Sequence, residues 1–208
     1  MDKQAAFWLD ALGANGELSA TMKHELDTQG YTIVHGVVDA DWLAAMRERI
    51  DYLVEKEGEN LAVEHHQEET ATRVANLVNK GVVWEKVWSH PLVLSACRYI
   101  FEGEFKISSL NAREALYNGG HQPLHADWKK PRPDFPKVHL VNTIWAIDDL
   151  YAANGAPRII PATHLRPELP EDVLDDVGLP HPDEVIFEAP AGSVMIYNAH
   201  AWHGGTTN

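Results

Sequence analysis

The clearest indication of fold class lies in Pro190-Ala191-Gly192-Ser193-Val194-Met195-Ile196-Tyr197-Asn198, a glycine-containing turn that leads into an apolar strand. Outward from it, the second half of the chain holds further short runs of strand-forming residues, separated by glycine, proline and Asn-Gly turn signals. The expected strands lie within residues 105–110, 137–147, 156–160, 184–188 and 193–198. Short strands at this spacing predict an antiparallel double sheet, that is, a double-stranded β-helix or cupin-like jelly roll.

The first half of the chain has the periodicity of helices. Ser19 is expected to cap a helix over residues 20–29, which Gly30 ends. Beyond it we expect a strand within residues 31–38 and a helix within residues 42–53 that begins after Asp39 or Asp41. A polar surface loop is expected at residues 57–72, and a helix that starts at Pro91 at residues 91–101. The prediction is one α+β domain over residues 1–208. Residues 1–104 form a largely helical support on one sheet, and residues 105–208 form the mainly β core.

Composition excludes several classes of function. The chain has 208 residues, a net charge of −14 and a sequence pI of about 5.2, which disfavours nucleic acid or an anionic membrane as partner. It lacks an apolar run of membrane-spanning length, and its first residues lack a signal-peptide pattern. The lone Cys97 cannot form an internal disulfide, so we expect a cytoplasmic protein. With nucleic acid and membrane disfavoured, we expect the substrate to be a small molecule. The sequence does not indicate the oligomeric state.

Metal chemistry is indicated by His125-Ala126-Asp127, because residues two apart on an extended strand point to the same face. The residues after the 190–198 segment supply a third imidazole, from either His200 or His203, and local sequence does not decide between them. Two histidines and one carboxylate leave adjacent coordination positions open, the arrangement of non-haem Fe(II) oxygenases. The competing interpretation is a surface hydrogen-bonded pair of His125 and Asp127, with the later histidines in the core or at its rim.

Several motifs in order resemble those of the phytanoyl-CoA dioxygenase family of Fe(II)/2-oxoglutarate oxygenases. The metal motif is Gln122-Pro123-Leu124-His125-Ala126-Asp127, and the distal segment runs from Gly192 to Asn208. Between them, Asn154-Gly155-Ala156 and Ile160-Pro161-Ala162-Thr163-His164-Leu165 resemble the "NG…PGSH" stretch, and residues 26–34 resemble the opening helix and strand.

The resemblance implies a set of site residues. His125, Asp127 and His203 would be the iron ligands, with His200 a neighbour, and Thr143 would contact 2-oxoglutarate. Asn111 and Tyr117 are weaker candidates for contact with co-substrate or substrate. The implied cofactors are Fe(II), 2-oxoglutarate and O2. Since family halogenases have a small residue where Asp127 stands, the resemblance favours hydroxylation of an unactivated C–H bond, with succinate and CO2 as co-products.

The sequence departs from the family pattern in two places. The family's Pro-Gly-Ser-His is Pro-Ala-Thr-His here. Relatives also carry an arginine about ten residues beyond the distal histidine, which pairs with the distal carboxylate of 2-oxoglutarate, and that position lies past Asn208. We expect the sequence to be truncated at its C-terminal end. The alternatives are that the anchor is lost or that Arg158 or Arg113 replaces it.

Two other functions fit the same residues. One is a jelly-roll hydrolase or isomerase that uses zinc or iron without 2-oxoglutarate. The other is a non-catalytic binding protein that has kept the scaffold. Metal dependence separates the first from an oxygenase, and titration with 2-oxoglutarate separates the second.

Overall fold

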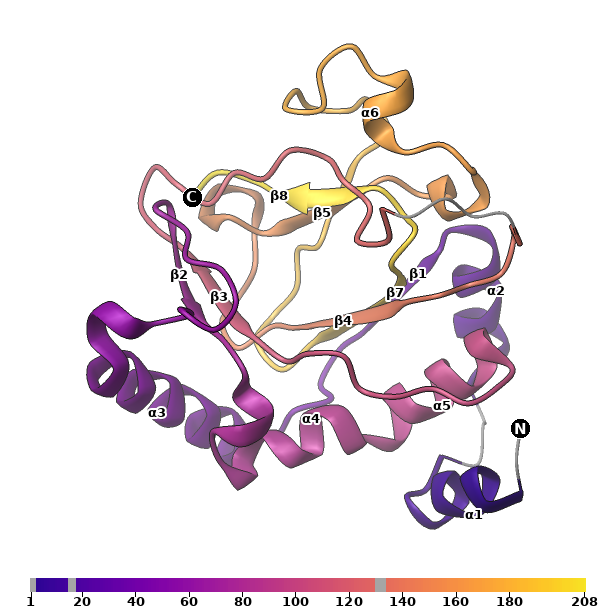
Figure 1. The fold of residues 1–208 in the computed structure, drawn as a ribbon, viewed down its shortest axis with the longest axis horizontal. Coiled ribbons are helices and arrows are strands. Elements are labelled where there is room, and N and C mark those ends of the chain that lie inside the picture. The colour runs from indigo at the N-terminus through magenta and orange to yellow at the C-terminus, as the bar shows by residue number, and fades with distance from the viewer. Residues whose placement is uncertain (1–2, 15–17, 130–133) are drawn as a thin grey trace.

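The computed structural model describes residues 3–14, 18–129 and 134–208. Helices occupy most of the first half and surround one side of the molecule (Figure 1). They are α1 Lys3–Ala11, α2 Ala20–Thr28, α3 Ala40–Glu57, α4 Glu85–Ser89 and α5 Pro91–Phe101, with a short α6 at Pro170–Val173. Among the residues described, no helix has the length and apolar character needed to cross a bilayer.

Side-chain caps set the starts of these helices. Ser19 accepts a hydrogen bond from the Met22 N–H at 3.1 Å, and Asp39, not Asp41, accepts one from Trp42 at 2.8 Å. Gly30 follows the end of α2 with φ +87°, in the left-handed region that glycine tolerates best. The helices predicted at 20–29 and 91–101 are confirmed, and the predicted helix after Asp39 extends to Glu57.

The strands form two main antiparallel layers and a ribbon. Their bounds are β1 Tyr31–Val34, β2 Ala71–Val74, β3 Ala112–Ala115, β4 Val141–Trp145, β5 Pro157–Ile159, β6 Val185–Ile186, β7 Val194–Asn198 and β8 His203–Gly205. The first layer has the order β1-β7-β4, the second β6-β5-β8, and β2 pairs with β3. The two layers lie one above the other in Figure 1, with the β2–β3 ribbon closing one side.

The central strand β7 shows how the layers pack. Val194 and Ile196 join a buried cluster with residues of α2 and α5, such as Leu26 and Val93. Met195 and Tyr197, on the opposite face, pack with residues of the second layer, Ile159 and Phe187 among them. Helices therefore cover the outer face of the first layer, and the space between the layers is the inside of the barrel. The predicted α+β jelly roll is confirmed.

The β2–β3 ribbon differs from the sequence prediction. Residues 105–110 do not form a strand, and β3 begins at Ala112 instead. Its partner β2 starts at Ala71, at the end of the segment 57–72 that was predicted to be a surface loop. These strands are polar and short, so their conformation depends on pairing with each other more than on local propensity.

Candidate metal centre

His125 and His203 face each other across two antiparallel segments. Their backbones exchange two hydrogen bonds, from the His125 N–H to the His203 carbonyl and back, each 2.9 Å long. The two imidazole centroids are consequently only 4.4 Å apart. The main chain therefore sets the spacing of the two rings.

Asp127 lies two residues beyond His125 on the same face, as the sequence predicts. Its Oδ1 is 3.8 Å from His125 Nε2, and its Oδ2 is 3.2 Å from His203 Nε2. One potential ligand atom from each of the three residues lies within 4.8 Å of the other two. The side chains of His125 and Asp127 remain 26% and 29% exposed, so the cluster is open on one side.

Both histidines are held in the tautomer that suits a metal. Nδ1 of His125 lies 2.8 Å from the carbonyl oxygen of Pro123, and Nδ1 of His203 lies 2.9 Å from that of Ala201. A carbonyl can only accept, so each Nδ1 carries a proton, and a ring with no second proton presents the lone pair of Nε2. This second hydrogen bond is typical of metal-binding histidine. The donor set therefore fits a divalent transition metal.

Electrostatics favour the same protonation states. Burial, followed by the proximity of His203, lowers the pKa of His125 and keeps its ring neutral. Burial alone would raise the pKa of Asp127, but its hydrogen bond and attraction to His203 outweigh that effect and lower it. The cluster thus places the neutral imidazole of His125 beside the ionised carboxylate of Asp127.

Two further residues, which sequence reasoning missed, contact the cluster. Asn142 of β4 donates its side-chain N–H to Asp127 Oδ2 at 2.5 Å, and the hydroxyl of Tyr197 of β7 lies 3.4 Å from the same oxygen. Burial, then the charge of Asp127, raises the pKa of Tyr197, so the phenol keeps its proton. Local sequence held no signal for them, because the β4–β7 register, in which Asn142 and Tyr197 are direct cross-strand partners, brings them together.

His200 lies away from the cluster. Its Nε2 accepts a hydrogen bond from the His139 N–H at 3.1 Å, and its ring packs edge-on against those of His139 and Trp128. Of the two histidines that local sequence left open, His203 is the one beside Asp127.

Thr143 lies on the other face of β4 from Asn142. It is paired with Ile196, which packs against the helices, and its hydroxyl accepts a hydrogen bond from Trp145 Nε1 at 3.0 Å. The side chains of Thr143 and Trp145 therefore point to the helical layer and not into the barrel, whereas the family resemblance implies a contact of Thr143 with 2-oxoglutarate. Hydrophobic alternation could not indicate which side chains of β4 face the barrel, because both faces of the strand are covered.

The weaker candidates are also away from the cluster. Asn111 Oδ1 accepts a hydrogen bond from the backbone N–H of Asn76 at 3.1 Å. Tyr117 is 86% exposed. His164 Nε2 lies 3.3 Å from the Asp27 carbonyl at the end of α2.

The comparison with family models matches residues 26–208 to phytanoyl-CoA dioxygenase (PhyH). The chain belongs to the phytanoyl-CoA dioxygenase family. The resemblance found in the sequence is thereby confirmed. Among curated proteins, the chain is similar to "Dioxygenase af480" of Aspergillus fumigatus, with 27% identity over 138 residues. That match covers 65% of this chain but 43% of the fungal protein, so the chain spans less than half of its length.

Solved structures show the same fold at low identity. The non-heme alpha ketoglutarate dependent carbocyclase SnoK from nogalamycin biosynthesis matches with a TM-score of 0.72 and 21% identity, covering 94% of this chain and 79% of SnoK. HygX from Streptomyces hygroscopicus, solved with nickel and 2-oxoglutarate bound, matches with a TM-score of 0.72 and 12% identity, covering 91% and 81%. Both support the jelly-roll assignment.

Proposed function

We propose that this PhyH-family chain is a non-haem Fe(II)/2-oxoglutarate-dependent dioxygenase in which His125, Asp127 and His203 bind the iron. The observation that carries the proposal is the convergence of their ligand atoms within 4.8 Å. Two imidazoles and one carboxylate on one side of a metal leave the remaining positions for co-substrate and dioxygen. The 2-oxoglutarate named for both SnoK and HygX adds support from the same fold.

The chain's own residues supply orientation. The Nδ1 hydrogen bonds fix both imidazole planes, and Asn142 and Tyr197 hold one oxygen of Asp127. The apolar cluster behind Tyr197, which includes Met195 and Phe187, excludes water from the closed end of the barrel. A bound iron would supply the O2-dependent oxidative decarboxylation of 2-oxoglutarate to succinate and CO2, in which one oxygen atom goes to succinate and the other is available to oxidise the substrate.

The reaction that we favour is hydroxylation of an unactivated C–H bond in a small molecule. Asp127 is a carboxylate whose lowered pKa keeps it ionised, so it can act as the third protein ligand and fill that position. The open side of the cluster, where His125 and Asp127 are exposed, is where a substrate would approach. We expect residues 57–72 and 128–137 to frame that opening; of these, residues 130–133 lie outside the described part of the chain.

The test is metal and co-substrate dependence. Loaded anaerobically with Fe(II), the protein should bind 2-oxoglutarate saturably and, on admission of O2 with substrate, form succinate. His203→Ala should bind metal at least about tenfold more weakly, because it removes one of three ligands. His200→Gln is the matched control, since His200 lies in the turn between β7 and β8 and outside the cluster, and should retain wild-type metal affinity.

Three outcomes would contradict the proposal. Restoration of activity by Zn(II) but not Fe(II) would indicate a hydrolase or isomerase. Absence of 2-oxoglutarate binding by the metal-loaded wild type would indicate a binding protein. Loss of metal with His200→Gln and retention with His203→Ala would show that the cluster does not bind metal.

A further inference from the structure

The peptide group between Ala201 and Trp202 connects His203 to the turn that contains Thr163. Its carbonyl oxygen accepts a hydrogen bond from His203 Nδ1 at 2.9 Å. Its N–H donates to the hydroxyl oxygen of Thr163, also at 2.9 Å. Because a peptide group is planar, the direction of its carbonyl is fixed by the direction of its N–H. The orientation of the His203 imidazole therefore depends on Thr163.

The hydroxyl of Thr163 both donates and accepts. It donates to the Ile160 carbonyl at 2.7 Å and accepts from the Trp202 N–H. Ile160 in turn donates its own N–H to the Trp202 carbonyl at 2.8 Å. One short turn thus fixes the main chain of Trp202 at both its N–H and its carbonyl. Successive hydrogen bonds of this kind polarise and strengthen one another.

These hydrogen bonds are shielded from water. Thr163 is 4% exposed, Trp202 is 1% exposed and His203 is 7% exposed. In such a place solvent does not replace a lost hydrogen bond, and the group left behind carries the cost of desolvation. The position of the Trp202 N–H therefore depends on the Thr163 hydroxyl.

The backbone beside Thr163 is strained. Ala162 has φ +64°, in the left-handed region, where a residue with a β-carbon loses free energy. Its N–H donates to the Gln29 carbonyl at 2.8 Å, and its carbonyl accepts from the Leu165 N–H at 3.1 Å. Strain of this kind persists where the surrounding contacts over-determine the backbone. The end of α2 and the turn itself therefore keep Thr163 in one place.

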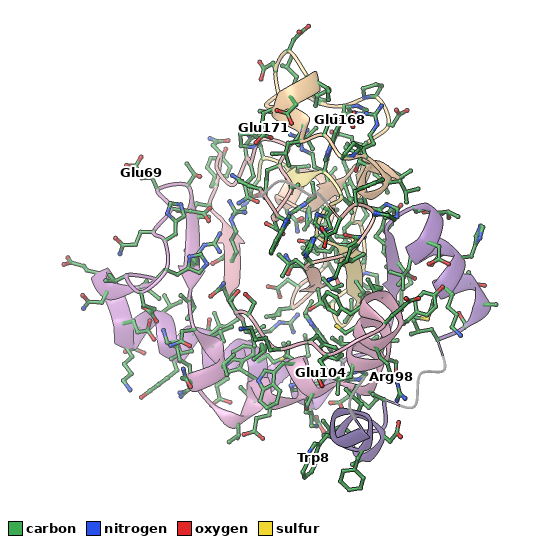
Figure 2. The ribbon with its side chains drawn as sticks, turned by 45° about the vertical axis from the view of Figure 1, so that its right-hand side comes forward. Trp8, Glu69, Arg98, Glu104, Glu168 and Glu171 are labelled. Atoms are coloured by element: carbon green, nitrogen blue, oxygen red, sulfur yellow. The ribbon has the colours of Figure 1, made fainter. Side chains whose placement is uncertain are left out.

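The indole of Trp202 is held separately from its main chain. Its Nε1 donates to the Glu168 carbonyl at 3.2 Å, and the guanidinium of Arg166 lies 5.3 Å from the centre of its ring. Glu168 and Glu171 lie at one end of the molecule, next to α6 (Figure 2). We therefore expect that loss of the Thr163 hydroxyl turns the peptide without displacing the indole.

His125 has the same arrangement on the facing segment. Its Nδ1 lies 2.8 Å from the carbonyl oxygen of Pro123, and the N–H of the same peptide group, from Leu124, donates to the Val177 carbonyl at 2.8 Å. Each imidazole of the cluster is thus oriented by a peptide group whose N–H is bound by another segment. The acceptor is main chain for His125 and a side chain for His203, so a substitution can remove only the second.

From these observations we propose that Thr163 is a positioning residue for His203. Through the peptide group between Ala201 and Trp202, its hydroxyl sets the orientation and the tautomer of the imidazole. This inference rests on the proposed function, in which His203 is an iron ligand, and adds to it a residue that touches neither metal nor substrate. The Pro161-Ala162-Thr163-His164 turn thereby acquires a part in the metal centre.

The experiment compares Thr163→Val, which removes the hydroxyl at nearly constant size, with Thr163→Ser, which keeps it. Titration with Co(II), followed through its visible d–d spectrum, gives both the affinity and the ligand geometry. Thr163→Val should bind Co(II) about tenfold more weakly and alter the spectrum, as expected on loss of a group that orients a metal ligand. Thr163→Ser should keep the wild-type affinity and spectrum. A Thr163→Ser variant as weak as Thr163→Val would overturn the proposal.

Thr32→Val is the matched control for stability. Thr32 is 1% exposed and its hydroxyl donates to Glu25 of α2, so this variant also loses a buried hydrogen bond. It should lower the urea midpoint of unfolding and leave the Co(II) affinity and spectrum unchanged. An equal loss of Co(II) affinity in Thr32→Val would show that stability alone governs binding, and the role of Thr163 would be wrong.

Heteronuclear NMR of the imidazole nitrogens in the metal-free protein gives a readout that does not require metal. The His203 ring should carry its proton on Nδ1 in the wild type, and Thr163→Val should shift it toward Nε2. An unchanged tautomer or an unchanged Co(II) affinity in Thr163→Val would overturn the proposal. If circular dichroism shows that Thr163→Val is unfolded, Thr163→Ala replaces it with the same expected results. If the wild type binds no Co(II), the proposed function fails, and the tautomer still decides the role of Thr163.

Discussion

The carboxylate of Asp127 depends on a neighbour from another strand. Asn142 reaches across from β4 and donates to Oδ2, and Tyr197 Oη lies near the same oxygen. These contacts restrict rotation of the carboxylate and fix the direction in which its free lone pairs point. A group that orients a metal ligand in this way contributes to metal affinity although it does not touch the metal.

Asn142→Ala should therefore lower the affinity for Co(II) by about 10- to 100-fold, the usual effect of removing such a support. Thr143→Val is the matched control, because it alters the adjacent residue on the opposite face of β4, next to Trp145. It should leave both Co(II) and 2-oxoglutarate affinity unchanged in isothermal titration. Weaker 2-oxoglutarate binding by Thr143→Val would restore the role that the family resemblance assigned to Thr143.

At the level of elements, the starts of helices could be predicted from the sequence, but the face of each strand that points into the barrel could not. The starts of α2 and α5 follow from Ser19 and Pro91, whose effects act within one turn of helix. The side of β4 that faces the barrel depends on packing with a distant helix, so sequence favoured Thr143 where the structure has Asn142. Local sequence likewise could not separate His200 from His203; pairing with His125 across the barrel makes the distinction.

The end of α2 docks on the turn that contains His164. The Ala162 N–H donates to the Gln29 carbonyl at 2.8 Å, and a β-carbon on Gly30 would collide with the imidazole of His164. Gly36 also has a positive φ, +67°, but has no atom within 4 Å of the place where its β-carbon would be. Gly30 and Gly36 therefore both have a positive φ, but only Gly30 is packed against another side chain.

Gly30→Ala should destabilise the protein by about 2–4 kcal/mol, the sum of backbone strain and overpacking. Gly36→Ala should cost only about 1 kcal/mol, from strain alone. Urea unfolding gives both values. In a His164→Ala background the excess cost of Gly30→Ala should shrink, and an excess that persists would show that His164 is not the obstacle.

For the whole molecule, the ion cluster of Glu68, Arg73 and Arg113 links the segment before β2 to the barrel wall. Burial alone would raise the pKa of Glu68, but its hydrogen bonds to Arg113 and Arg73 lower it below the ordinary value. A carboxyl whose pKa is lower in the folded state stabilises the fold above its unfolded pKa of about 4.3. That contribution is lost as the pH falls through the lower native value.

Glu68→Gln should therefore be less stable than wild type near pH 7, and the difference should vanish at a pH below the native pKa of Glu68. Urea unfolding at a series of pH values between about 7 and 3 measures this convergence. Asp148→Asn, which alters an exposed pair with Arg47, should have a small effect at every pH. A Glu68→Gln difference that does not change with pH would show that the ionisation of Glu68 is not coupled to folding.

The reciprocal backbone pairing of His125 with His203 has a consequence for how this scaffold can diversify. Since peptide groups fix the separation of the two rings, residues around the opening can change in size and charge without moving the ring nitrogens. The spacing of the two rings therefore does not depend on the side chains at the open side of the cluster. If the proposed function holds, we expect substitutions at the opening to alter substrate preference while the affinity for metal stays the same.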